Sequence, residues 1–195
     1  MLARLVDREQ PVQIVGTDEH RRFVLRHPQP VPELTNHRFE PLAKVAEGKA
    51  LLVVKNGNVR IENIEFRGAR SPEGNAAGIY FEKGRLEVVQ CAFFENQHGL
   101  LTANFRGAEL LILESEFARV PKEVGGLNHL LYVGAIANFT LTGSRLYGGF
   151  EGHLVKSRAK ETHLLYNMIR DGSEGEASYE VDLPSGGRAT LIGNV

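Results

Sequence analysis

The chain has 195 residues, 42% of them hydrophobic, and its 23 Lys and Arg residues nearly balance 24 Asp and Glu residues to a net charge of −1. This balance gives no reason to expect a nucleic-acid partner or an anionic membrane surface. The single cysteine excludes an internal disulfide framework, and the length fits one domain over residues 1–195.

Residues 1–46 are the least regular part of the chain. Residues 12–16 (VQIVG) have the composition of an early strand of the stack, whereas residues 26–41 contain four prolines and predict a long excursion. The first ten residues carry four charged side chains, unlike a secretory signal, so the localisation stays open.

From residue 47 onward the chain repeats one pattern, after a strand expected at 51–54. Six segments begin at Val59, Leu86, Leu110, Phe139, Thr162 and Ala189. Two positions later the residue is always aliphatic: Ile61, Val88, Ile112, Leu141, Leu164 and Leu191. Five positions later it is mostly small or polar: Ile64, Cys91, Ser115, Ser144, Asn167 and Asn194. Seven positions later it is bulky: Phe66, Phe93, Phe117, Leu146 and Ile169. Such a period with strand-like alternation predicts a stacked solenoid.

The residue types favour strands on every side of this solenoid. The repeats are rich in β-branched and aromatic residues and lack the leucine frame and helical period of leucine-rich repeats. The expected fold is therefore all-β, a right-handed parallel β-helix with an irregular N-terminal segment. The aliphatic position should form an interior column, the small position a polar ladder at a corner, and Cys91 a buried filler.

Neither end of the repeat region carries a polar capping element. An uncapped solenoid exposes a strand edge and apolar core. The chain is therefore expected to be a fragment of a longer helix or to self-associate through its ends.

The strands before the template carry the candidate chemistry, in residues 128–134 (NHLLYVG), 152–158 (GHLVKSR) and 178–184 (SYEVDLP). Strict alternation places Leu131, Val155 and Val181 inside. It places Leu130, Leu154 and Glu180 in one outer row and Tyr132, Lys156 and Asp182 in the next. Arg158 shares this outer face, with Asn128 beside it and with His129 and His153 stacked at its edge. An ordinary salt-bridged surface is the alternative, and a metal held by His129, His153 and Glu180 is disfavoured.

These three runs resemble bacterial parallel β-helix repeat proteins of the pectate-lyase-like superfamily, over residues 47–195. Lys156-Ser157 and the following 162–169 (THLLYNMI) are more distantly similar to the alginate lyase and chondroitinase B group. That resemblance implies a periplasmic or extracellular protein that acts on an acidic polysaccharide. It also implies Lys156 as the catalytic base, an arginine acid and calcium on the uronate carboxylate. Here Glu180 and Asp182 stand where that arginine is expected.

Three functions follow as alternatives. In a polysaccharide lyase, Lys156 would remove the proton, Arg158 would neutralise the carboxylate, and Tyr132 or His153 would protonate the leaving group. The expected substrate-binding residues are Asn128, His129, Glu180 and Asp182. In an inverting glycoside hydrolase, Glu180 and Asp182 would be the acid and base, about 7 Å apart on one strand. The third alternative is a glycan-binding or structural β-helix without catalysis.

Overall fold

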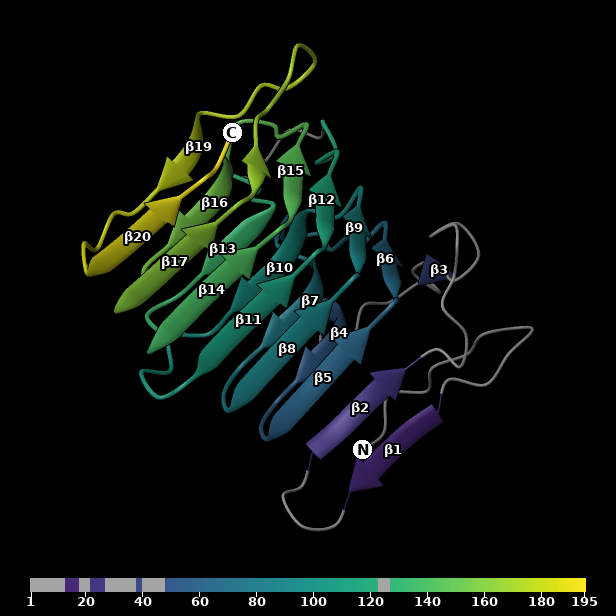
Figure 1. The fold of residues 1–195 in the computed structure, drawn as a ribbon. Helices are drawn as coiled ribbons and strands as arrows, with labels where there is room; N and C mark the ends of the chain where they lie inside the picture. The colour runs from purple at the N-terminus through teal and green to yellow at the C-terminus, as the bar shows by residue number, and fades with distance from the viewer. Residues whose placement is uncertain (1–12, 18–21, 27–37, 40–47, 123–126) are drawn as a thin grey trace.

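The chain winds as a parallel β-solenoid in the computed structural model, which describes residues 13–17, 22–26, 38–39, 48–122 and 127–195 (Figure 1). Three sheets run along the solenoid, and each complete turn adds one strand to each sheet. Strands and turns make up all of these residues, so no helix among them could span a membrane. The predicted all-β parallel solenoid is confirmed, and its right-handed sense stays a prediction.

Sheet A contains β1 (Gln13–Thr17), β2 (Arg22–Arg26), β5 (Asn58–Glu62), β8 (Arg85–Val89), β11 (Glu109–Leu113), β14 (Asn138–Thr142), β17 (Glu161–Leu165) and β20 (Arg188–Ile192). Sheet B contains β3 (Arg38–Phe39), β6 (Glu65–Arg67), β9 (Ala92–Phe94), β12 (Glu116–Ala118), β15 (Arg145–Tyr147) and β18 (Met168–Ile169). Sheet C contains β4 (Ala50–Val54), β7 (Ala77–Phe81), β10 (His98–Thr102), β13 (Leu131–Val133), β16 (His153–Ser157) and β19 (Tyr179–Asp182).

The first strands depart from the expectation for residues 1–46. Strand β1 pairs antiparallel with β2, so the expected strand is present but does not belong to the parallel winding. Strand β2 then pairs parallel with β5, and β3 with β6, so the parallel stack starts earlier than residue 47. Most of the predicted excursion at 26–41 lies outside the described residues.

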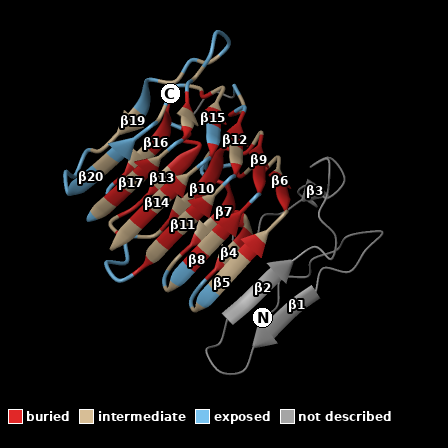
Figure 2. Cartoon of the chain, in the orientation of Figure 1, coloured by how far each residue is buried: buried red, intermediate tan, exposed pale blue. Residues whose placement is uncertain are grey.

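The aliphatic position of the repeat forms one interior column, as predicted. Its members are in register from turn to turn: Ile61, Val88, Ile112, Leu141, Leu164 and Leu191. The first five are fully buried, whereas Leu191 on the last turn is 52% exposed (Figure 2). The predicted contacts between the ends of two copies stay a prediction.

The small position forms the predicted polar ladder at the corner between sheets A and B. The residue before it has a left-handed backbone with φ between 48° and 63° on each turn: Asn63, Gln90, Glu114, Gly143, Tyr166 and Gly193. Each ladder oxygen accepts a backbone N–H from the preceding turn, as Ser144 Oγ does from Ser115 at 3.1 Å and Asn167 Oδ1 from Ser144 at 2.9 Å. Because the corner breaks the strand pairing, these side chains supply the missing acceptors.

Cys91 sits in the same ladder and is buried, with 1% of its surface exposed. Burial raises the pKa of its thiol to about 12. The prediction of a buried filler is confirmed.

Sheet C breaks strict alternation, and this changes which side chains reach solvent. A Cβ added at Gly78 would lie 2.9 Å from Phe93 Cδ1, and one at Gly99 would lie 2.8 Å from Phe117 Cδ1, so this position faces the core. Leu130 and Leu154 occupy it on the next two turns and are buried in the same core cluster. The prediction that both leucines face outward is therefore wrong. On each of these turns two consecutive residues face the core, Leu130 with Leu131 and Leu154 with Val155, so strict alternation does not hold.

The same position shows how the core keeps its volume along the solenoid. Glycine stands there on the two turns whose sheet B strand supplies a stacked phenylalanine, Phe93 or Phe117, with ring centroids 4.4 Å apart. Leucine stands there on the two turns where sheet B supplies the smaller Leu146 and Ile169. On these four turns large residues thus face small ones, as close packing requires, whereas Leu51 takes the same position on the turn of Phe66.

Candidate functional site

Two columns of side chains face outward from sheet C, where a column is one register position on successive turns. The ring column contains His98, His129, His153 and Tyr179. The Lys156 column contains Tyr80, Leu101, Tyr132, Lys156 and Asp182. The structure therefore brings together six of the eight site residues expected from the sequence: His129, Tyr132, His153, Lys156, Arg158 and Asp182.

Asp182 joins the two columns with one carboxylate oxygen. Its Oδ2 lies 3.3 Å from Lys156 Nζ and 3.1 Å from His153 Nδ1. All three side chains are largely buried, so the attraction between them is less screened than in a surface ion pair. The contact to His153 is too bent for a regular hydrogen bond, and Nδ1 has no other partner.

Tyr132 lies beside both cations of the predicted site. Its ring centroid is 5.8 Å from Lys156 Nζ and also 5.8 Å from Arg158 Cζ. Arg158 itself is exposed on the same strand end as Lys156. A phenol with two positive charges at this distance is stabilised by cation–π attraction of about 0.5–1 kcal/mol for each exposed contact.

The histidines stack along the solenoid, as the sequence predicted for His129 and His153. Ring centroids are 5.7 Å apart from His98 to His129 and 4.8 Å apart from His129 to His153. The backbone N–H of His129 donates to His98 Nδ1 at 3.0 Å, and that of His153 donates to His129 Nδ1 at 2.8 Å. The rings of His98 and His129 therefore each accept a backbone N–H of the next turn.

Burial keeps these rings uncharged. It lowers the pKa of His98 to about 4 and that of His129 to about 3, where the neighbouring histidines, Lys156 and Arg158 contribute further. Burial also lowers the pKa of His153, with Asp182 opposing this effect and Lys156 adding to it.

Asn128 lies one residue before His129, in register with Gly152, and its Oδ1 is buried without a partner. The next turn approaches it closely, because a Cβ on Gly152 would lie 1.9 Å from the Asn128 carbonyl oxygen. Only glycine fits there without moving backbone. Among the described residues, the fully buried polar side-chain atoms without a partner are Asn128 Oδ1 and His153 Nδ1.

Glu180 and Asp182 do not face each other. Glu180 stands in register with the buried Leu154, but on the last turn it is exposed, and its Oε1 accepts the backbone N–H of Asp171 at 3.2 Å. The two carboxylates thus contact different partners, because the break in alternation separates positions 180 and 182.

Two residues near the site were missed in the sequence. Asp171 accepts the backbone N–H groups of Gly149 and Ala177 and so holds the turn before β19. The turn-forming Asp171-Gly172 pair was the available signal. Tyr179 packs edge-on against His153, with ring centroids 5.2 Å apart. Its register with His129 and His153 was visible in the sequence.

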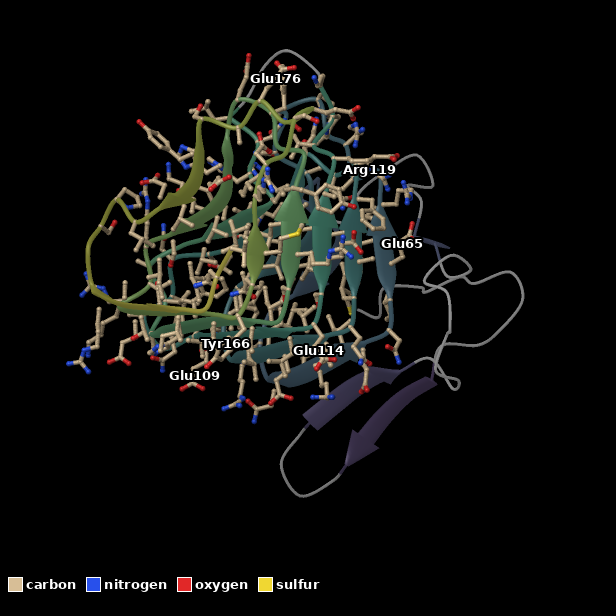
Figure 3. All side chains as sticks on the ribbon, turned by 45° about the horizontal axis from the view of Figure 1, so that its top comes forward. Glu65, Glu109, Glu114, Arg119, Tyr166 and Glu176 are labelled. Carbon is tan, nitrogen blue, oxygen red and sulfur yellow. The ribbon has the colours of Figure 1, made fainter. Side chains whose placement is uncertain are left out.

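The described cavities lie elsewhere. One of about 230 Å³ is on the outer face of sheet A, beside Glu109 and His163. One of about 430 Å³ lies at the corner between sheets B and C, where Lys122 and Glu176 form an ion pair. Figure 3 shows Arg119 and Glu176 at this corner, and Glu109, Glu114 and Tyr166 on the opposite side along sheet A.

The acidic residues near the site do not suit calcium. Calcium takes six to eight oxygen ligands, whereas Asp182 is shared by two nitrogen groups and Glu180 binds a backbone N–H. No group of three or more His, Cys, Asp or Glu residues in the described part of the chain could hold a metal ion.

Comparison with known proteins gives no match: no family model, no curated protein and no solved structure is similar to this chain.

Proposed function

We propose that the outer face of sheet C binds an acidic, uronate-containing glycan and cleaves it by β-elimination. One observation carries the proposal. His153 Nδ1, one of the two fully buried polar side-chain atoms without a hydrogen-bond partner among the described residues, lies 3.1 Å from the Asp182 carboxylate, which also lies 3.3 Å from Lys156 Nζ. An unpaired buried polar atom costs about 1–3 kcal/mol, and such costs are typically retained at functional sites.

Two cations are available for the uronate carboxylate. Lys156 forms an ion pair with Asp182 across 3.3 Å, and Arg158 lies on the same strand end. We therefore assign Lys156, together with Arg158, to neutralising the carboxylate and the enolate-like intermediate rather than to proton removal. The sequence-based assignment of Lys156 as the base stays the alternative.

His153 is the base in this proposal. Its lowered pKa keeps it neutral near pH 7, and Asp182 favours the tautomer with the proton on Nδ1. Its Nε2 would take the proton from the carbon next to the carboxylate. The electron pair of that C–H bond forms the new double bond, and the C–O bond to the leaving sugar breaks. Tyr132 would give its phenolic proton to the leaving oxygen, and solvent then restores both groups.

Membership of the pectate-lyase-like superfamily belongs to the same proposal. The support is the parallel solenoid itself, with its candidate site on one outer sheet face. The hydrolase alternative is not favoured, because Glu180 and Asp182 have separate partners. Glycan binding without cleavage remains the second candidate, since the two cations beside Tyr132 suit a carboxylate whether or not a bond breaks.

The test is incubation of the full chain with a panel of polymers of galacturonate, mannuronate, guluronate and glucuronate. Ultraviolet absorbance of the unsaturated product and reducing ends are followed separately. Elimination produces both signals, hydrolysis produces reducing ends alone, and a binding protein produces neither but is detected by titration calorimetry.

Variants assign the roles. His153→Gln should abolish cleavage and leave binding, and Lys156→Ala should weaken both. The exposed Lys160→Ala is the matched control. The proposal would be refuted if the protein neither cleaved nor bound any of these polymers.

A further inference from the structure

The imidazole rings of His98 and His129 each have one nitrogen committed to the backbone. Nδ1 of His98 faces the N–H of His129, and Nδ1 of His129 faces the N–H of His153. A backbone N–H can only donate, so both Nδ1 atoms must be unprotonated acceptors. The His129 carbonyl also lies 3.3 Å from His98 Nδ1, but an accepting Nδ1 has no proton to give it. In the neutral ring the proton is then on Nε2.

The Nε2–H groups have no protein acceptor among the described residues. They are also absent from the fully buried polar atoms that lack a partner in this part of the chain, so each keeps a small exposed surface, although the residues as a whole are only 7% and 3% exposed. With pKa values of about 4 and about 3, both rings stay uncharged donors across the physiological range. Uncharged donors suit hydroxyl, ring or carboxylate oxygens.

The two donors extend from the reaction centre in one direction. The rings of His153, His129 and His98 follow one another at one per turn, and Tyr132 contacts the last two with centroids 5.3 Å and 6.5 Å away. Two turns of a solenoid span about 10 Å, which is longer than one sugar ring. On the other side of His153 the ring column continues as Tyr179, whose side chain carries a phenol hydroxyl in place of an imidazole N–H.

We infer that His98 and His129 form binding subsites for successive sugar units, so that the ligand is a chain lying along the solenoid axis from Asp182 toward β10. This inference rests on the proposed function, since it takes the ligand to be the glycan that reacts at His153. It names the substrate class as an oligomer of at least three units.

The first experiment needs no ligand and no variant. Long-range ¹H–¹⁵N NMR spectra distinguish the two tautomers of each histidine ring. We expect Nε2–H for His98 and His129, and Nδ1–H for His153. A protonated Nδ1 at His98 or His129 would overturn the inference, whatever the protein does with glycans.

The second experiment measures affinity for galacturonate and mannuronate oligomers of one to four units by calorimetry, with His98→Asn, His129→Asn and His163→Asn. Asparagine keeps an oxygen acceptor for the backbone, as Asn167 and Asn194 already do in this chain at 2.9 Å and 3.0 Å, but loses Nε2–H. His163, on sheet A, is the matched control. Wild-type affinity should rise with length up to three units, and each ring-column variant should lose about ten-fold for the longer oligomers, which corresponds to one hydrogen bond.

The outcomes separate the two proposals. The subsite inference is refuted, and the proposed function is not, if the wild-type protein binds oligomers equally at every length or if His129→Asn binds like wild type. If the wild-type protein binds no uronate oligomer, both the proposed function and the subsite inference are refuted. Unchanged backbone spectra of the variants exclude loss of folding as the cause.

Discussion

The backbone N–H of His153 donates to Nδ1 of His129 across 2.8 Å, so a ring of the candidate site also holds two turns of the solenoid together. Site and scaffold therefore share the same hydrogen bonds. A substitution at His129 should therefore lower the stability of the fold as well as the proposed ligand binding, unless the new side chain keeps the backbone acceptor.

His129→Leu should lower the free energy of unfolding by about 1–3 kcal/mol, because the buried N–H of His153 loses its acceptor. His129→Asn should lose clearly less, since an amide oxygen can take the place of Nδ1. Denaturant unfolding followed by circular dichroism gives both values. Equal losses in the two variants would show that the ring acts by packing rather than as an acceptor.

Ile112→Ala should cost about 2–5 kcal/mol, because Ile112 is fully buried in the middle of the interior column. Leu191→Ala provides the matched comparison in the same column. Leu191 is half exposed on the last turn, so its loss should be much smaller. The same unfolding experiment measures both, and similar costs would contradict the assigned register.

Gly152→Ala should destabilise the protein by about 1–3 kcal/mol and disturb the site, because the new Cβ meets the Asn128 carbonyl oxygen, which is backbone and cannot rotate away. Gly107→Ala is the control, since its nearest neighbour is the exposed ring of Phe105 at 3.2 Å. Thermal unfolding compares the two. A Gly152→Ala protein as stable as wild type would mean that the close approach is absent.

Stability should fall as the pH drops below about 6.5, the ordinary histidine pKa. The pKa values of His98 and His129 are lowered to about 4 and about 3, so in this window the unfolded chain binds protons that the folded chain does not. The contribution of the two uncharged rings to the free energy of unfolding is fully present above about pH 6.5. As the pH falls from there to each folded-state pKa, this contribution decreases by about 1.4 kcal/mol per pH unit for each ring. Carboxylates titrate there too, so the measurement is the difference between wild type and His98→Asn. An identical pH dependence would contradict the assignment.

The sequence predicted the repeat register well because each turn repeats the same packing problem. Ile112 and Leu141 must fill the same position, so spacing alone reveals the column. The polar ladder was predictable for the same reason, since every corner leaves an N–H that Ser144 or Asn167 can satisfy.

The details of sheet C could not be read from alternation. Leu130 and Leu154 point inward because the strand has two consecutive core-facing residues there, and Gly78 and Gly99, at the same position, carry no side chain to show it. The antiparallel pairing of β1 was also hidden, because a strand pattern does not specify direction. The partner of Glu180 depends on a turn contact that no periodicity encodes.

The triad of Lys156, Asp182 and His153 gives the last prediction, which concerns the pKa of His153. Burial lowers this pKa, Asp182 raises it, and Lys156 lowers it. Asp182→Asn should therefore shift the His153 pKa further down, and Lys156→Met should shift it up. The opposite signs distinguish electrostatic contact from a general loss of structure, which would move both variants toward the ordinary value.

NMR titration of the imidazole carbon-bound protons measures these shifts without any substrate, and His163 on sheet A serves as the reference that should not move. If His153 is the base, the acid limb of the cleavage rate must move with it, to lower pH in Asp182→Asn and to higher pH in Lys156→Met, because only the neutral ring accepts the proton. If the imidazole pKa shifts but the acid limb of the cleavage rate does not move with it, the contacts among Lys156, Asp182 and His153 are confirmed, and His153 is not the base. Absence of any shift in His153 would mean that Asp182 and Lys156 do not act on the ring at all.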